Sequence, residues 1–161
     1  MGFMLTREAA VDRLELVDAF KGCTRTQLKQ VARLAEHVQV GQGEVLAREG
    51  RIGREFFLVL SGTVSVSQGG RKVNVLGAGS FFGELAAINP GVRNATVTAE
   101  TEVDVLIIGP REFATMAAIP GFRDALFKSM ADRLRTADAR LAAVQDEEDE
   151  DTEGEPPTTR M

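Results

Sequence analysis

The middle of this 161-residue chain, from Val38 to Ile108, consists of short β-branched or aromatic segments separated by glycines. Val, Ile and Phe favour strands, and glycine supplies the turns between them. Gln68-Gly69-Gly70-Arg71 is the clearest hairpin turn. Many short strands at regular spacing restrict the fold to a jelly roll or a barrel. The predicted strands are 37–41, 44–48, 55–60, 63–68, 71–76, 95–99 and 103–108.

Both ends of the chain show helical patterns instead. Residues 7–20 and 24–36 predict two helices before the strands, separated by Gly22-Cys23-Thr24. Residues 110–118 predict a short helix that Pro120-Gly121 ends, and residues 121–145 predict a long one. The sequence therefore predicts one domain over residues 1–145, with helices at 7–36, strands at 37–108 and helices at 110–145.

The formal net charge of −5 is concentrated in the last residues of the chain. Eight acids lie between positions 146 and 155, and Pro156-Pro157 follows them. We predict that residues 146–161 are a disordered acidic tail. Without this tail the body is close to neutral and has no basic stripe, so neither DNA nor an anionic membrane is an expected partner.

Composition and a few single residues indicate the cellular compartment and exclude some classes of catalytic and metal site. The N-terminus has no basic segment followed by an apolar core, and no apolar run is long enough to cross a membrane. Cys23 is the only cysteine, which fits a reducing cytoplasm. His37 is the only histidine, so a metal-binding cupin or a second catalytic histidine is excluded. We expect no catalytic residue, no metal ion and no cofactor, and we expect His37 to be structural.

The segment from Phe82 to Thr96 carries the strongest functional pattern. Gly83 lets the backbone approach a ligand closely, and N–H groups at the start of a helical turn over 84–88 attract an anion. Arg93 supplies a permanently charged planar fork. Glu84 would repel a phosphate unless it accepts a hydrogen bond from a separate donor, such as a sugar hydroxyl. A phosphate and a sugar hydroxyl together indicate a nucleotide.

The order Gly83-Glu84-Leu85-Ala86, six residues, then Arg93-Asn94-Ala95-Thr96 resembles the phosphate-binding cassette of cyclic nucleotide-binding domains. That family includes the catabolite activator protein and the regulatory subunits of cAMP-dependent protein kinase. The resemblance covers about residues 15–145. It implies an α+β fold, in which N-terminal helices and C-terminal lid or hinge helices flank an eight-stranded antiparallel jelly-roll barrel.

The resemblance also implies roles for single residues. Arg93 would hold the exocyclic phosphate, and Glu84 would accept a hydrogen bond from the ribose 2′-hydroxyl. Gly83, Leu85 and Ala86 would contribute backbone groups, and Leu85 packs in the core or moves with the hinge. Asn94 and Ala95 complete the expected nucleotide-binding set, but Asn94 departs from the family pattern, because Ser, Thr or Ala is common directly after the arginine. We expect the ligand to be cAMP in preference to cGMP. The residue Asn94 leaves the preference for one base over the other open, because its amide can donate to the phosphate or to guanine.

The long C-terminal helix carries the candidate contacts to the base. Arg133 can stack over the base, or it is a solvated helix residue. The adenine-contacting Thr-Ser pair of the catabolite activator family corresponds to Ala137-Asp138 in this chain, and Thr136 lies directly before it. Thr136 and Ala137 are therefore candidate contacts to the base. An apolar stripe with steps of four and three predicts either a homodimer seam in helix 121–145 or a lid on the same barrel. The stripe comprises Leu126, Met130, Leu134, Ala137, Leu141 and Val144.

Two functional hypotheses follow. In the first, the chain is a cytoplasmic cyclic nucleotide sensor and not an enzyme. Ligand binding would shift the C-terminal helix, and this shift would regulate an unknown effector protein. We expect a separate effector because the sequence shows no DNA-binding, kinase or channel segment after the helix, which suggests a stand-alone module. In the second, the chain is a structural or interaction protein that uses the same barrel with little nucleotide binding. The intact set of Gly83, Glu84 and Arg93 favours the first.

Overall fold

The computed structural model describes residues 6–17, 20–83, 91–128, 130–132, 134–135 and 143. The chain divides into two compact units, Met1–Ala125 and Leu126–Met161. The first unit contains every strand of the described residues and the helices α1, α2 and α4. In the second unit, the described residues from 126 to 135 and residue 143 are helical.

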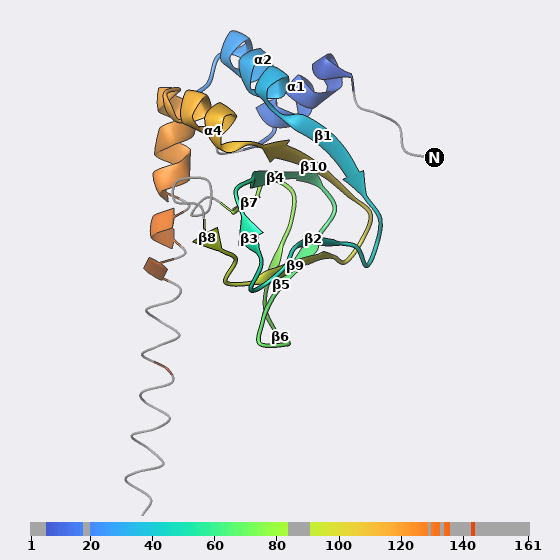
Figure 1. The fold of residues 1–161 in the computed structure, drawn as a ribbon. Coiled ribbons are helices and arrows are strands. Elements are labelled where there is room, and N and C mark those ends of the chain that lie inside the picture. Colours follow the sequence, from blue (N-terminus) through green and yellow to red (C-terminus); the bar gives the residue numbers. More distant parts are fainter. Residues whose placement is uncertain are drawn as a thin grey trace, which may run out of the picture. The chain divides into compact units, whose positions relative to one another are not determined.

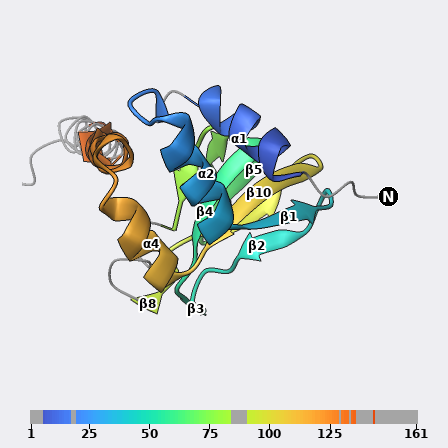
Figure 2. The same cartoon turned by 90° about the horizontal axis from the view of Figure 1, so that it is seen from above.

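Two capped helices open the first unit. Helix α1 (Arg7–Glu15) begins after Thr6, whose side chain accepts a hydrogen bond from the Ala9 N–H at 3.1 Å. Helix α2 (Arg25–Leu34) begins with a capping box, in which the side chains of Thr24 and Gln27 each accept from the other's backbone N–H. Such caps satisfy the donors that a helix start leaves unpaired. Figure 2 shows the two helices side by side over the strands.

The described residues form ten strands in three antiparallel sheets. One sheet has the order β1-β10-β4-β7, the second has the order β2-β9-β5-β6, and β3 pairs only with β8. Helix α4 (Pro110–Ala117) follows the last strand directly. The strands are β1 (Glu36–Val40), β2 (Val45–Ala47), β3 (Ile52–Gly53), β4 (Phe56–Ser61), β5 (Val64–Gln68), β6 (Arg71–Leu76), β7 (Phe81–Phe82), β8 (Gly91–Val92), β9 (Thr96–Ala99) and β10 (Val103–Ile108).

The two four-stranded sheets enclose an apolar core. Val59 and Val105 from one sheet and Val64 and Val97 from the other belong to the same buried cluster. This burial follows from alternation along the strands, because successive side chains of a strand point to opposite faces. Helices α1, α2 and α4 lie next to the sheet that contains β1, β4 and β10. The β5–β6 hairpin lies at the opposite end of the first unit (Figure 1).

A second buried cluster is aromatic and joins the helices to the first sheet. Phe56 of β4 contacts Phe81 of β7 and Phe113 of α4, with ring centroids 5.4 and 5.0 Å apart. Phe20 and Phe122 stack at 5.8 Å, and both rings also contact Phe81. Apolar burial of this kind stabilises a side chain by about 1.5–3 kcal/mol, and paired rings add to it. The cluster therefore anchors the helical residues around position 122 to the sheet.

The predicted elements agree with the structure in type and differ at their ends. The four predicted helical regions contain helix, but α1 ends at Glu15 and not near position 20, because the chain turns there and Phe20 enters the core. All seven predicted strands are present. The mixed helical and antiparallel fold is confirmed, whereas the pairings of the described residues do not confirm one closed eight-stranded barrel. Strands β3 and β8 have two residues each, too few for a visible alternation.

Candidate functional site: a buried arginine between two glycines

Arg93 follows the short strand β8 and is fixed by its backbone. Its N–H donates to the carbonyl of Arg51 at 2.8 Å, and its own carbonyl accepts from the N–H of Gly50 at 2.8 Å. The preceding residues extend this ladder, since β3 and β8 pair with Ile52 opposite Val92 and Gly53 opposite Gly91. The loop that carries Arg93 is therefore tied to residues 50–53.

The side chain of Arg93 is packed into the protein, with only 9% of its surface exposed. Its Nη2 donates to the backbone carbonyl of Glu55 at 2.9 Å and lies 3.4 Å from the Glu55 carboxylate. The guanidinium carbon is 5.5 Å from the centre of the Phe57 ring, within the range of a cation–π contact. The Phe57 ring in turn stacks on Phe82 at 4.5 Å, so the arginine rests on a rigid aromatic support.

Two glycines make room for this arginine. A Cβ added at Gly53 would lie 1.8 Å from Arg93 Nε, and one added at Gly83 would lie 2.8 Å from Arg93 Nη1. Gly83 also has a φ of 82°, a conformation that side-chain-bearing residues rarely adopt. A Cβ there would approach the carbonyl of Glu55 to 2.6 Å. The guanidinium thus occupies a slot that only glycine permits on both sides.

The electrostatics leave Arg93 available to an anion. Burial lowers the pKa of Arg93, and the nearby Glu55 carboxylate opposes that shift. An arginine in a protein stays protonated, so the result is a charged group with little water around it. Within the part of the chain that the structure describes, Nε and Nη1 donate to no residue. The remaining donors match the bidentate demand of a phosphate.

The residues next to Arg93 are placed as follows. Asn94 is exposed, and its backbone carbonyl accepts from the Gln68 side chain at 3.1 Å. Ala95 is half-buried, and Thr96 receives a hydrogen bond from the Glu49 N–H at 3.0 Å. The structure thus brings Gly83 and Arg93 into contact and leaves the Asn94 side chain at the surface.

Six predicted site residues lie outside the described residues, so their roles remain predictions. They are Glu84, Leu85 and Ala86 of the predicted cassette, and Arg133, Thr136 and Ala137 of the predicted C-terminal helix.

Three residues of the slot were missed as site residues by sequence reasoning. Gly53, Glu55 and Phe57 come about 40 positions before Arg93, and none of them forms a motif with it along the chain. Gly53 stood out only as one of several turn glycines. The sequence signal for these residues was the pattern Gly53-Arg54-Glu55 before an apolar strand. This pattern does not show that they contact Arg93.

Outside the Arg93 slot, two of the described residues that could carry chemistry are His37 and Cys23. The His37 side chain is nearly buried, and its Nε2 lies 3.2 Å from the Asp104 carboxylate, while its structural role stays a prediction. Burial raises the pKa of the Cys23 thiol, which lowers its thiolate fraction at neutral pH. The described residues contain no group of three His, Cys, Asp or Glu side chains that could hold a metal ion. None of the helices among those residues is long and apolar enough to cross a membrane.

Comparison with known proteins yields relatives that carry this segment within longer chains. The chain is 37% identical over 91 residues to a cAMP-dependent protein kinase regulatory subunit of Schizosaccharomyces pombe, covering 56% of this chain and 22% of that protein. It is 29% identical over 123 residues to a cGMP-dependent protein kinase of Eimeria tenella, covering 76% of this chain and 12% of that protein. The match therefore spans less than a quarter of either relative.

Solved structures and family models agree with these relatives. The catabolite activator protein of Thermus thermophilus superposes with a TM-score of 0.71 at 26% identity, covering 79% of this chain and 62% of that one. The model of the cyclic nucleotide-binding domain matches residues 37–119, which include Gly53, Gly83 and Arg93. Since that match covers more than half of its residues, the chain belongs to the cyclic nucleotide-binding domain family.

Proposed function

We propose that the chain is a cyclic nucleotide sensor in which Arg93 holds the cyclic phosphate. The observation that carries this proposal is the slot between Gly53 and Gly83. It buries a charged guanidinium and leaves Nε and Nη1 without an acceptor among the described residues. A buried cation with unused donors is stabilised by an anionic ligand. The Glu55 carboxylate is half-exposed and 3.4 Å away, which makes it a weak counter-ion.

The sugar and the base extend the proposal. Glu84 accepts a hydrogen bond from the ribose 2′-hydroxyl, while the backbone of Gly83, Leu85 and Ala86 faces the phosphate. The base lies against the wall of the predicted eight-stranded jelly-roll barrel. We propose cAMP as the ligand in preference to cGMP. The relatives include proteins whose names carry either nucleotide, so the choice is made by experiment.

Signalling requires that the ligand favours one of two conformations. We propose that the occupied cassette shifts the helix over 121–145, with Arg133, Thr136 and Ala137 near the base, and that this helix regulates a partner protein in the cytoplasm. A second copy of the chain, paired through the same helix, is a further candidate partner. In the competing function, a structural protein uses the same fold with little or no nucleotide binding.

Isothermal titration calorimetry of the whole chain with cAMP and with cGMP separates these functions. The sensor binds at least one of the two nucleotides. An Arg93→Ala variant should lose about 2–5 kcal/mol of binding free energy, since the phosphate then lies in the slot without its partner. This loss corresponds to at least about a thirtyfold weaker Kd.

Arg71→Ala is the matched control, because Arg71 is an exposed arginine on β6 with no ion pair among the described residues. Its affinity should equal that of the wild-type chain. Absence of heat with both nucleotides would favour the structural protein. Wild-type affinity in Arg93→Ala would show that the slot does not hold the phosphate.

A further inference from the structure

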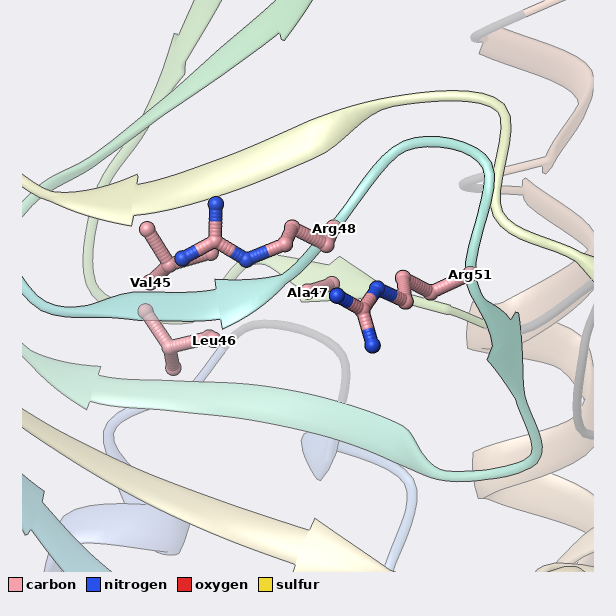
Figure 3. A pocket seen from close by; sticks show the side chains of 5 residues that line it. All are labelled: Val45, Leu46, Ala47, Arg48 and Arg51. Carbon is pink, nitrogen blue, oxygen red and sulfur yellow. The ribbon is translucent and has the colours of Figure 1, made fainter.

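A hollow beside strand β2 has a strongly cationic lining. It measures about 290 Å³, and two arginines and three apolar residues line it. Figure 3 shows the side chains of Arg48 and Arg51 running in the same direction along β2. The lining residues are Val45, Leu46, Ala47, Arg48 and Arg51.

Among the described residues, no acidic side chain is paired with the two guanidinium groups. Neither Arg48 nor Arg51 forms an ion pair with any residue that the structure describes. Glu49 lies between them in sequence, but its carboxylate accepts the N–H of Gly69 at 2.9 Å and is thereby tied to the β5–β6 turn. Two like charges on one hollow repel each other, and this repulsion is relieved when an anion binds between them.

The backbone holds both arginines in place. The N–H of Arg51 donates to the carbonyl of Arg48 at 3.1 Å, which closes the turn over residues 48–51. The same turn is bonded to Arg93 twice, through the Gly50 N–H and the Arg51 carbonyl. The backbone spacing of Arg48 and Arg51 is thus fixed by the ladder that positions Arg93. Arg93 itself does not line the hollow.

We propose that Arg48 and Arg51 form a binding site for a diphosphate group. Each guanidinium offers a planar fork that matches the oxygens of one phosphoryl group, so two forks match two linked phosphoryl groups. The partly exposed Val45 provides an apolar wall against which an organic part of the ligand can pack. The site goes beyond the proposed cyclic nucleotide function, because a cyclic nucleotide carries a single phosphate.

Calorimetry of the whole chain with inorganic pyrophosphate, at low ionic strength to limit screening, tests the site. Pyrophosphate should bind at least about fivefold more tightly than inorganic phosphate, since only the former engages both forks. Arg48→Gln and Arg51→Gln should each weaken pyrophosphate binding by about fivefold or more, and the double variant should abolish it. ADP in place of pyrophosphate distinguishes a nucleotide source from the inorganic ion, since tighter binding of ADP shows use of the apolar wall.

Two control variants make the outcome specific. Arg54→Gln removes an exposed arginine three positions further along that does not line the hollow, so its pyrophosphate affinity should be unchanged. Arg93→Ala should also retain pyrophosphate binding, whatever it does to cyclic nucleotides. The proposal is overturned if pyrophosphate gives no heat, if Arg54→Gln weakens binding as much as Arg48→Gln, or if Arg93→Ala abolishes it. Thermal melts of all variants, including the buried Arg93→Ala, check that the fold is intact.

Discussion

At the scale of single residues, the site depends on the absence of two side chains. Gly53 is buried, and the Arg93 side chain fills the volume that its Cβ would need. Gly83 combines a positive φ with a close approach to the Glu55 carbonyl. A substitution at Gly83 therefore meets backbone strain and backbone atoms, whereas the three atoms nearest to a Cβ at Gly53 all belong to the Arg93 side chain. The two glycines act on the same guanidinium for different physical reasons.

Gly53→Ala should destabilise the fold by about 1–3 kcal/mol, because the new methyl group overlaps Arg93 Nε. The same substitution in an Arg93→Ala background should cost much less, since the colliding side chain is gone. Urea unfolding of the four chains of this double-mutant cycle measures the difference. Gly77→Ala is the control, because a Cβ at Gly77 meets nothing within 4 Å. Equal costs in both backgrounds would contradict the close packing of Gly53 on Arg93.

The sequence predicted Arg93 and Gly83 because they belong to one short segment with a recognisable order. It did not predict their contact with Glu55, which directly precedes β4, or with the ring of Phe57 on that strand. Local order along a chain carries information on backbone conformation and capping. The pairing of β3 with β8, which brings residue 53 to residue 93, is decided by the whole sheet.

At the scale of elements, the Asp104 carboxylate connects one helix to three strands. It lies on β10 and accepts hydrogen bonds from Arg13 of α1 at 2.9 Å and from Ser61 of β4 at 2.8 Å. His37 of β1 lies 3.2 Å from its other oxygen. Burial alone would raise the pKa of Asp104, but the hydrogen bonds from Arg13 and Ser61 and the charges of Arg13 and His37 outweigh it and lower the pKa.

The lowered pKa of Asp104 predicts a pH dependence of stability. In the unfolded chain this carboxyl titrates near pH 3.9, and in the folded chain it titrates lower. Its contribution is therefore complete above about pH 4 and is lost as the pH falls through the folded value. Asp104→Asn should lower the free energy of unfolding by about 1 kcal/mol at neutral pH, because the network is partly exposed. It should also reduce the loss of stability below pH 4.

Urea unfolding between pH 7 and pH 2.5 measures both effects. Asp124→Asn is the matched control, since Asp124 is exposed and forms no ion pair among the described residues. Its acid profile should follow that of the wild-type chain. Parallel acid profiles for Asp104→Asn and the wild-type chain would show that Asp104 does not cause the pH dependence.

At the scale of the whole molecule, aromatic packing links the segment before the cassette to the start of the C-terminal helical region. Phe81 and Phe82 form β7 directly before Gly83. Phe82 supports the Phe57 ring beneath Arg93, and Phe81 lies 5.9 Å from Phe122. A displacement of residues 81–83 would therefore be felt by both the guanidinium slot and the helical residues around Phe122. This contact supplies a physical route for the proposed signalling.

Hydrogen exchange with and without saturating cAMP tests that route. If the ligand shifts the C-terminal helix, the exchange rates of amides in residues 121–145 should change together with those of residues 83–95. The Arg93→Ala chain at the same cAMP concentration should show neither change. Protection confined to residues 83–95 would indicate binding without a response of the helix, and the proposed signalling would then be wrong.

The sequence by itself determined the types of element and their order, and it indicated the segment that we propose binds phosphate. Each of these depends on short-range chemistry: alternation along strands, caps at helix starts, and the glycine, acid and arginine of one loop. Only the tertiary structure decided which strands pair, why position 53 is a glycine, and that the Arg93 guanidinium lies against Phe57, with Nε and Nη1 donating to none of the described residues. These features depend on contacts between residues far apart in the sequence, such as Glu36 and Ile107 in the pairing of β1 with β10, and their geometry follows from the packing of the whole first unit.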